Sequence, residues 1–457
     1  MKMKLSQFKN VIGRLKKYPW KESGQSLKYL PRVLGRPEKI IILLLFGLVF
    51  ILVFILGYND WLNKTKLVPT FGGEFREGIV GESKDLDKHL ARLTNAGLTK
   101  YDSEKNIVGD LADKWEIKED GKVYEFHLRE GFFSEDLANQ IISKNLWQDI
   151  NISTPDPQVI SFTFKQSFSP FLYTSTEPVF NYGPYRISKE SKDEIELTSR
   201  DDYYAGRAYI NKIVVKLYRN KDDLIKAAKH GDVQAISLEE DFDSLAGFQK
   251  FETKLPRQLI LFFNLNNNDL KNIKVRQALK ENTSPGKELT FRLVTLDKEK
   301  NINLAKEIAD RWSKIGVTIN IDVKDNVTLQ KTIIPKRDYD MLLYGLDYGE
   351  DPDPYPFWHS SQANVDGRNL ANFKNTKADK LLEQARLEFD FVKREQEYAD
   401  FGKILDSEAP MLVIEQCNFF YQVSEKVKGI EKIVGSNEAD RFLNIASWYM
   451  ETKRVKK

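Results

Sequence analysis

The sequence is poor in cysteine and histidine, two residue types on which many catalytic and metal sites depend. Its 457 residues include one cysteine, Cys417, and four histidines in distant segments: His89, His127, His230 and His359. A nucleophile paired with a base, or a cluster of soft metal ligands, therefore has few candidates. A single cysteine also forms no intramolecular disulfide, so a fold outside the cytoplasm would depend on its hydrophobic core. We expect a protein that is not an enzyme and carries no cofactor or metal.

The chain also lacks a general excess of one charge. It has 70 Lys/Arg and 67 Asp/Glu residues, a net charge of +3. Residues 1–39 hold eleven of the basic residues and two of the acidic ones, which leaves 59 basic and 65 acidic residues, or −6, for the remainder. Nucleic-acid binding needs a basic face together with elements that read the bases. The basic block lies in the leader, where anionic lipid headgroups explain it, so we expect no nucleic-acid partner.

One long apolar run is present, residues 40–57, with the sequence IIILLLFGLVFILVFILG. At about 1.5 Å per residue it spans most of a hydrocarbon core, which predicts one transmembrane helix. The basic leader places the N-terminal end in the cytoplasm and everything after residue 58 outside. A cleaved signal peptide is the alternative, although residues 58–61 offer no small-residue cleavage site. We predict a cytoplasmic leader over residues 1–39, a membrane helix over 40–57 and a polar stalk over 58–70.

Strand-like and helix-like patterns alternate from about residue 71 onward, which indicates an α/β fold. The clearest unit is strand–helix–strand. Residues 289–295 are typical of a strand, apolar residues from Leu304 to Trp312 line one face of a helix, and Gly316 marks its end. Residues 317–323 then alternate as a second strand. This unit predicts a parallel pair of strands with a right-handed crossover, and its apolar stripe is interpreted as core.

The most distinctive segment is residues 347–358, DYGEDPDPYPFW. It contains four carboxylates, three prolines and four aromatic residues. Proline limits the entropy lost when a loop is ordered, aromatic rings supply contact area, and a partly buried carboxylate needs a positive partner. The composition predicts a rigid loop that binds a cationic group. A calcium site, ordinary turn aspartates and core aromatics are the alternatives.

Six short motifs occur in order between Phe71 and Arg454. They are Asp110-Leu111-Ala112 with Trp115-Glu116-Ile117, DGKVYEFHLR over residues 120–129, Tyr182-Gly183-Pro184-Tyr185, Val275-Arg276-Gln277-Ala278-Leu279, GRNLANFKN over 367–375, and Glu408-Ala409-Pro410. Each motif is weak alone. As an ordered set they resemble the family 5 extracytoplasmic solute-binding proteins of peptide/nickel-type ABC transporters.

The resemblance implies a periplasmic-binding-protein-like fold, in which two α/β lobes with mixed sheets close on a ligand without altering it. Crossover strands near residues 259–265 and 413–421 would join the lobes. The implied domains are lobe I over 71–262 with a reduced inserted subdomain near 130–165, lobe II over 263–418, and a return to lobe I over 419–457.

The resemblance also implies a ligand-binding residue in the acidic loop. In peptide-binding members of the family, an aspartate in this loop pairs with the free amino end of the ligand. Mapped onto this chain, the first choice is Asp347, followed by Tyr348, and the second is Asp351; Tyr344 and Trp358 would line the pocket. The chemistry agrees, because an ammonium buried between closing lobes needs a carboxylate.

The chain departs from the family's pattern after Phe133, after Leu279 and near the first strand, where segments typical of the family are trimmed. Three hypotheses follow. The first is a monomeric, membrane-anchored receptor that captures a ligand, most simply a peptide, and delivers it to an ABC permease. The second is a binding-protein fold that acts as a sensor or interaction module without a transport ligand. The third is a membrane-tethered hydrolase that uses His359 near Asp347 or Asp351.

Overall fold

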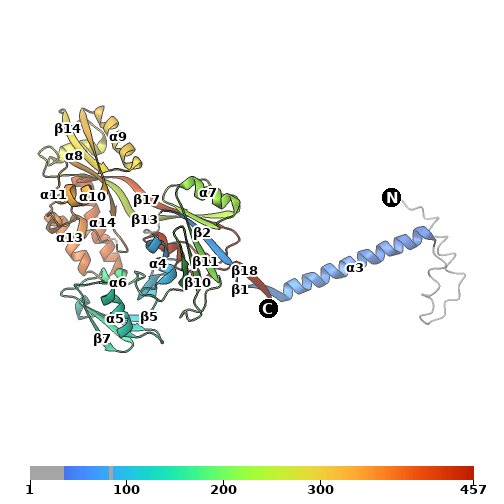
Figure 1. Ribbon diagram of the computed structural model, residues 1–457. Helices are drawn as coiled ribbons and strands as arrows, with labels where there is room; N and C mark the ends of the chain where they lie inside the picture. The colour runs from blue at the N-terminus through green and yellow to red at the C-terminus, as the bar shows by residue number, and fades with distance from the viewer. Residues whose placement is uncertain (1–34, 82–85, 352) are drawn as a thin grey trace. The chain divides into compact units, whose positions relative to one another are not determined.

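The computed structural model describes residues 35–81, 86–351 and 353–457 (Figure 1). The chain divides into two compact units, one of Met1–Thr70 with Thr452–Lys457 and one of Phe71–Glu451. Most of the predicted leader, residues 1–34, lies outside the described residues.

The first unit contains one long helix and a two-stranded sheet. Helix α3 (Arg36–Lys64) is followed directly by β1 (Thr65–Thr70), which pairs with β18 (Glu451–Lys456) from the other end of the chain. Over Lys39–Lys64 the helix is long and apolar enough to cross a membrane, and it is the one such helix in the described part of the chain. Its apolar side chains are almost all exposed.

The ends of this unit differ from the predicted boundaries. Residues 58–64 continue the helix and residues 65–70 form a strand, where a polar stalk was expected. Helix hydrogen bonds lie within the segment, so the helix does not have to end where the apolar run ends. Residues 452–457, predicted to return to lobe I, belong instead to the first unit.

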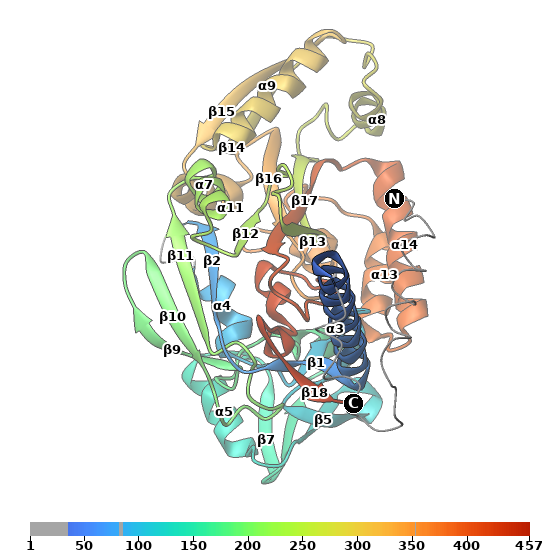
Figure 2. The same cartoon turned by 90° about the vertical axis from the view of Figure 1, so that its right-hand side faces the viewer.

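A ten-stranded sheet runs through the second unit in the order β15-β14-β16-β13-β17-β12-β2-β11-β10-β9. Its two central strands, β13 (Phe248–Phe263) and β17 (Met411–Ser424), are the longest and run antiparallel. The strands on one side of this pair build lobe I and those on the other side build lobe II (Figures 1 and 2). The α/β fold with two lobes and crossover strands, predicted from the sequence, is confirmed.

The register between the crossover strands is interrupted between Lys254 and Gln258. Pro256 in this stretch has no backbone N–H and cannot continue the ladder. The side-chain amide of Gln416 on β17 fills the gap by donating to the carbonyls of Leu255 at 2.6 Å and Arg257 at 3.0 Å. The regular backbone pairing of the two crossover strands is therefore interrupted where the lobes join.

Lobe I packs helices against its half of the sheet, around a core that includes Phe75, Tyr421 and Trp448. Its elements are β2 (Glu74–Val80), α4 (Leu86–Thr94), β3 (Thr99–Tyr101), β4 (Ile107–Gly109), β9 (Tyr185–Glu190), β10 (Glu194–Ser199), β11 (Lys212–Tyr218), α7 (Lys221–His230), β12 (Ala235–Leu238), η6 (Glu438–Phe442) and η7 (Ile445–Ser447).

A subdomain inserted into lobe I has its own four-stranded sheet, in the order β5-β6-β8-β7. Its elements are β5 (Ala112–Lys118), η3 (Glu119–Gly121), β6 (Val123–Leu128), α5 (Ser134–Ser143), β7 (Asn151–Asp156), β8 (Val159–Thr163) and α6 (Phe171–Thr174). Aromatic residues such as Phe126, Phe162 and Phe171 fill the space between its sheet and helices.

Lobe II contains the predicted strand–helix–strand unit, which is confirmed. β14 (Leu289–Leu296) and β15 (Val317–Lys324) are parallel, and α9 (Glu299–Ser313) between them buries Ala305, Ile308 and Trp312. The other elements are α8 (Ile273–Glu281), α10 (Asn326–Thr328), η4 (Leu329–Ile333), α11 (Ile334–Lys336), β16 (Met341–Asp347), α12 (Tyr355–Trp358), η5 (Ser360–Gln362), α13 (Thr376–Leu387) and α14 (Phe391–Glu408).

Lobe II also touches the inserted subdomain. The backbone N–H of Ser169 donates to the carbonyl of Arg386 at 2.9 Å, and the Phe389 ring lies 6.4 Å from that of Tyr124. The two lobes thus meet both at the crossover strands and at the α13–α14 turn.

Candidate functional site

A pocket of about 450 Å³ lies where the crossover strands, both lobes and the inserted subdomain converge. Its floor comes from the irregular stretch of β13 and from Gln416. The remaining walls come from five places in the chain: Tyr101 and Lys105; Tyr173; Gly349 and Glu350; Arg394, Glu395 and Tyr398; and Gly435 and Ser436. A movement of one lobe relative to the other would change the shape of this pocket, because its walls belong to both.

Glu350 connects the acidic loop of lobe II to lobe I. Its carboxylate oxygen Oε1 accepts a hydrogen bond of 2.7 Å from Asn437 Nδ2, and its main-chain carbonyl accepts one of 3.3 Å from the Tyr101 hydroxyl. The second oxygen, Oε2, is buried without a hydrogen-bond partner among the described residues. A buried carboxylate oxygen without a donor is costly. The Ser436 side chain, which lines the same pocket, favours the charged form of Glu350 and so opposes the rise in its pKa that burial causes.

The surroundings of Glu350 hold more negative than positive charge. Burial and the Asp440 carboxylate raise the pKa of Glu350 to about 7, although the Arg92 guanidinium opposes the shift and Glu177 adds to it. Arg92 is already paired with Asp440, at 2.7 Å between Nε and Oδ1. One guanidinium thus serves three carboxylates, and an additional cation in the pocket would be stabilised.

Asp347, the first choice from the sequence, is the last residue of β16 and pairs with Arg257 of the crossover strand β13. Its Oδ2 lies 3.1 Å from Arg257 Nε, and its Oδ1 accepts a hydrogen bond of 2.9 Å from the N–H of Gly349. Arg257 also binds Glu438 of lobe I at 2.9 Å. The Asp347 side chain is about half exposed, at 49 %, and it is not among the residues that line the pocket.

Asp351 and Asp353 each pair with an arginine of lobe II. Both oxygens of Asp351 accept hydrogen bonds from Arg394 Nη2, at 2.8 and 2.7 Å. Asp353 Oδ2 lies 2.7 Å from Arg386 Nη2. Burial raises the pKa of Asp351 to about 6 although Arg394 favours its charged form. Three carboxylates of the acidic loop therefore point to three different arginines, which does not resemble a calcium site.

Arg394 lines the pocket and is also the ion-pair partner of Asp351. Its guanidinium lies over the rings of Tyr173 at 5.0 Å and Tyr398 at 5.1 Å. Tyr173 belongs to the inserted subdomain, so this stack connects lobe II to it. Lys105 and Lys254 are the other cations that line the pocket, and neither has an ion-pair partner among the described residues.

Tyr344, Tyr348 and Trp358, which the sequence suggested as pocket residues, contribute to the core of lobe II. Trp358 is completely buried, with its ring 5.9 Å from Phe262. Tyr348 packs edge-on against Phe357 at 5.3 Å, and Gln330 donates to the Tyr344 hydroxyl. None of the three lines the pocket. An aromatic residue next to an apolar strand packs against neighbours before it reaches a cleft, which is the physical reason for the difference.

His359, the basis of the hydrolase hypothesis, has other partners. Its ring stacks on Tyr355 at 4.1 Å, its Nδ1 lies 2.7 Å from Ser361 Oγ and its Nε2 lies 3.3 Å from Glu383 Oε1. Neither Asp347 nor Asp351 is among these contacts, so the pairing of His359 with one of these aspartates, on which the hydrolase hypothesis depends, is not present.

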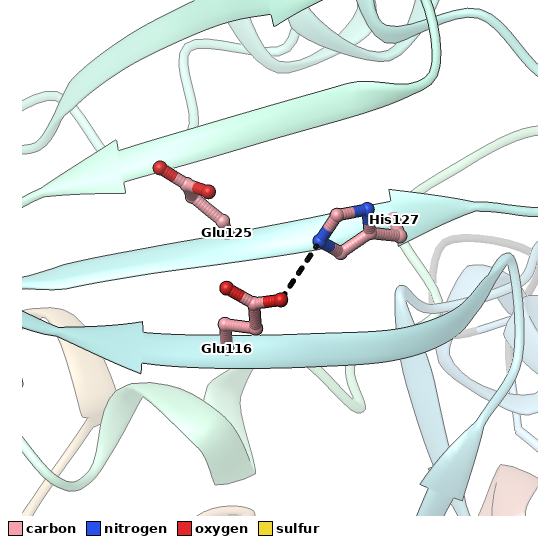
Figure 3. Close-up of side chains that lie close together, drawn as sticks. All are labelled: Glu116, Glu125 and His127. Atoms are coloured by element: carbon pink, nitrogen blue, oxygen red, sulfur yellow. Dashed lines mark ion pairs between the residues drawn. The ribbon is translucent and has the colours of Figure 1, made fainter.

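A second pocket and a cluster of two glutamates with a histidine are weaker candidates for the functional site. A pocket of about 610 Å³ is lined by residues of lobe I, including the β3–β4 hairpin, with no residue of lobe II or of the crossover strands. Glu116, Glu125 and His127 cluster on the sheet of the inserted subdomain (Figure 3). Lys118 forms ion pairs with both glutamates, which offsets part of their negative charge.

Sequence reasoning missed Glu350. It is one of the four carboxylates of residues 347–358, so its type was visible, but only the fold shows that its side chain crosses to lobe I. Spacing within the motif favoured an aspartate followed by an aromatic residue and therefore pointed to Asp347.

Comparisons with known proteins concern the family that the chain resembles and its fold. Residues 135–281 match the model for bacterial extracellular solute-binding proteins, family 5 middle. The oligopeptide-binding protein AppA of Bacillus subtilis is 20% identical over 338 residues, which cover 59% of this chain and 61% of that protein. The probable D,D-dipeptide-binding periplasmic protein DdpA of Escherichia coli is 20% identical over 435 residues, which cover 72% of this chain and 84% of that protein. The chain thus matches about three fifths of the length of the Bacillus relative.

The solved structure of AppA from Bacillus subtilis in complex with a nonapeptide has the same fold. It superposes with a TM-score of 0.64 at 17% sequence identity, covering 84% of this chain and 100% of that chain. At this identity the likeness concerns the fold alone.

Proposed function

We propose that this chain is a family 5 bacterial extracellular solute-binding protein, and that it captures a short peptide between its lobes and delivers it to an ABC permease. The match of residues 135–281 to the family model and the two peptide-binding relatives support this proposal. The family binds solutes without changing them chemically. The observation that carries the proposal is the pocket between the lobes, whose wall includes Glu350, a carboxyl with one buried oxygen that lacks a hydrogen-bond partner among the described residues.

Glu350 is the partner proposed for the free amino end of the ligand. An ammonium group can donate to Oε2 and offset the desolvation that raises the pKa of this carboxyl. The excess of carboxylates over guanidinium around it favours the same charge. Asp347 remains the prediction from the sequence, but its carboxylate already has Arg257 and the Gly349 N–H as partners.

The size and charge of the pocket favour a peptide of few residues. About 450 Å³ falls within the range of roughly 300–1,000 Å³ that accommodates a small organic ligand. Lys105 and Lys254 supply positive charge for the carboxylate end, and Tyr101, Tyr173 and Tyr398 supply aromatic surface for side chains. A ligand with both an ammonium and a carboxylate group satisfies the pocket better than a ligand with one charge.

Capture is proposed to work by lobe closure. Arg394 stacks on Tyr173, Glu350 bonds to Asn437, and Arg257 bonds to Glu438, so several polar contacts link the lobes around the pocket. A ligand that contacts both walls shifts the population toward the closed form, because only that form makes all the contacts.

The apolar helix α3 is proposed to anchor the binding unit to the membrane that holds the permease. The length and apolar composition of this helix support the anchoring role. The basic leader supports a cytoplasmic N-terminus, with the second unit outside. The protein then needs no covalent lipid to remain near its permease.

The test is thermal unfolding of the full chain in detergent with a library of peptides of two to five residues. A ligand that binds only the folded state stabilises it, by about 2.7 kcal/mol at a concentration 100 times its Kd. We expect a subset of peptides to raise the unfolding temperature. No rise with any peptide would contradict peptide capture and favour the alternative, a binding-protein fold that acts as a sensor or interaction module.

A further inference from the structure

Basic side chains gather at one end of helix α3 in the first unit. They belong to Lys64, Lys66, Lys453, Arg454, Lys456 and Lys457, and all six residues are exposed. Within residues 58–70 and 451–457 the acidic residues are Asp60, whose Oδ2 lies 2.8 Å from Lys64 Nζ, and Glu451, against six basic ones. We call the two strands β1 and β18 together with Lys64 and Lys457 the basic ribbon.

The fold brings these charges together from opposite ends of the chain. The backbone N–H of Lys457 donates to the carbonyl of Lys64 at 2.9 Å, and Arg454 Nη1 donates to the Thr65 hydroxyl at 3.0 Å. The Arg454 guanidinium also lies over the Trp61 ring at 4.8 Å. Figures 1 and 2 show β1 and β18 side by side at the end of α3. The sequence shows two separate short basic stretches, and pairing makes them one surface.

The order of residue types along the helix matches the layers of a bilayer. The apolar run ends at residue 57, Tyr58 and Trp61 follow with their rings stacked at 5.9 Å, and the first cations of the ribbon come directly after them. Aromatic rings favour the membrane interface, and lysine and arginine favour the headgroup region beyond it. The ribbon therefore emerges at the depth where lipid phosphates lie.

We propose that the basic ribbon binds the phosphate groups of anionic phospholipids in the outer leaflet of the membrane that α3 spans. This rests on the proposed membrane anchor. Six cations within a two-stranded ribbon lie close enough for their fields to add over a Debye length of about 8–10 Å at physiological salt. The ribbon holds both chain connections to the binding unit, at Thr70–Phe71 and at Glu451–Thr452, so headgroup binding fixes both connections at the membrane surface.

The test is amide hydrogen exchange of the full chain in lipid nanodiscs, made with phosphatidylcholine alone or with phosphatidylglycerol added. Residues 65–70 and 451–457 are expected to exchange about threefold more slowly with the anionic lipid at about 0.05 M salt, and this difference should vanish at about 1 M salt. In the variant K66Q/K453Q/K456Q/K457Q the difference should be lost. Arg454 is kept because it contacts Thr65 and Trp61.

The matched control is K229Q/K271Q/K274Q/K306Q, which removes the same number of exposed lysines from the second unit and should retain the lipid effect. Equal exchange of the wild type in both nanodiscs, or a lipid effect that persists in the ribbon variant, would overturn the proposal. Failure of the wild type to enter either nanodisc would overturn the membrane anchor instead.

Discussion

The side-chain amide of Asn437 in lobe I donates a hydrogen bond of 2.7 Å to Glu350 Oε1 in lobe II, and the other oxygen of Glu350 remains buried and unpartnered at the pocket. This contact places the Glu350 carboxyl at the junction of the lobes, in the wall of the pocket. An amide on one side and a vacant acceptor position on the other suit a site that closes around an ammonium group.

Peptide affinity should depend on pH through this carboxylate. Since burial raises the pKa of Glu350 to about 7, a peptide ammonium must displace a proton below that pH, and affinity should fall up to about tenfold per pH unit there. Above about pH 8 the α-amino group of the peptide loses its own proton and affinity should fall again. Isothermal titration calorimetry from pH 5 to pH 9 measures this profile. Glu350→Gln should bind more weakly at pH 7.5 and lack the acidic limb; an unchanged profile would contradict the role of Glu350.

The free energy of unfolding of the unliganded protein should fall as pH rises toward 7, whereas peptide affinity should rise. The pKa of Glu350 is higher in the folded protein, at about 7, than its ordinary value of 4.5. Between these values the folded state binds the proton more tightly, so the free energy of unfolding falls as pH rises from about 4.5 to 7. Relative to the wild type, Glu350→Gln should gain about 1–3 kcal/mol between pH 5 and pH 8. Urea unfolding at both pH values checks this, and a constant difference between the two proteins would count against the shifted pKa.

Replacing Arg394 should lower the stability of the folded protein. Asp351 and Arg394 are 9 % and 5 % exposed, and Arg394→Met leaves the Asp351 carboxylate buried without its partner. We expect a loss of about 3–5 kcal/mol in the free energy of unfolding. Adding Asp351→Asn should recover part of that loss, because the uncompensated charge is removed. If the double variant were as unstable as the sum of the single ones, the two residues would not act as a pair.

Trp358 should behave as a core residue. Its side chain is fully buried against Phe262 and Phe373, so Trp358→Ala should cost about 3–5 kcal/mol in unfolding free energy. The affinity of the folded fraction for a peptide should change by less than about threefold. Calorimetry below the unfolding temperature separates the two effects. A large loss of affinity in a folded Trp358→Ala variant would contradict a purely structural role and support the sequence-based prediction that Trp358 lines the pocket.

The fold was accessible from the sequence because its signals are local. The alternation of residues 317–323 and the helix stripe ending at Trp312 predict β15 and α9, and the ordered motifs predict the two-lobed arrangement. The choice of site residue depends on long-range contacts. Asp347, Glu350 and Asp351 lie within five positions, but one meets Arg257, one meets Asn437 and one meets Arg394. Spacing cannot show which of three neighbouring carboxylates crosses to the other lobe.

The basic ribbon escaped prediction for a similar reason. Residues 58–70 have the composition of a stalk, and the partner strand begins at residue 451, near the other end of the sequence. Hydrophobic periodicity is the main local signal of a strand, and a short exposed two-stranded ribbon has little of it. The expected stalk is therefore a paired element that connects the two units through two chain segments instead of one.

The most direct test of the central claim compares one peptide with a free amino end and the same peptide with an acetylated amino end. Their affinities should be measured by calorimetry against the wild type, Glu350→Gln and Asp347→Asn. We predict that acetylation and Glu350→Gln each weaken binding by tenfold or more, that their effects do not add, and that Asp347→Asn changes affinity by less than about threefold. Equal binding of both peptides by the wild type, or additive losses in Glu350→Gln, would contradict a contact between Glu350 and the peptide ammonium.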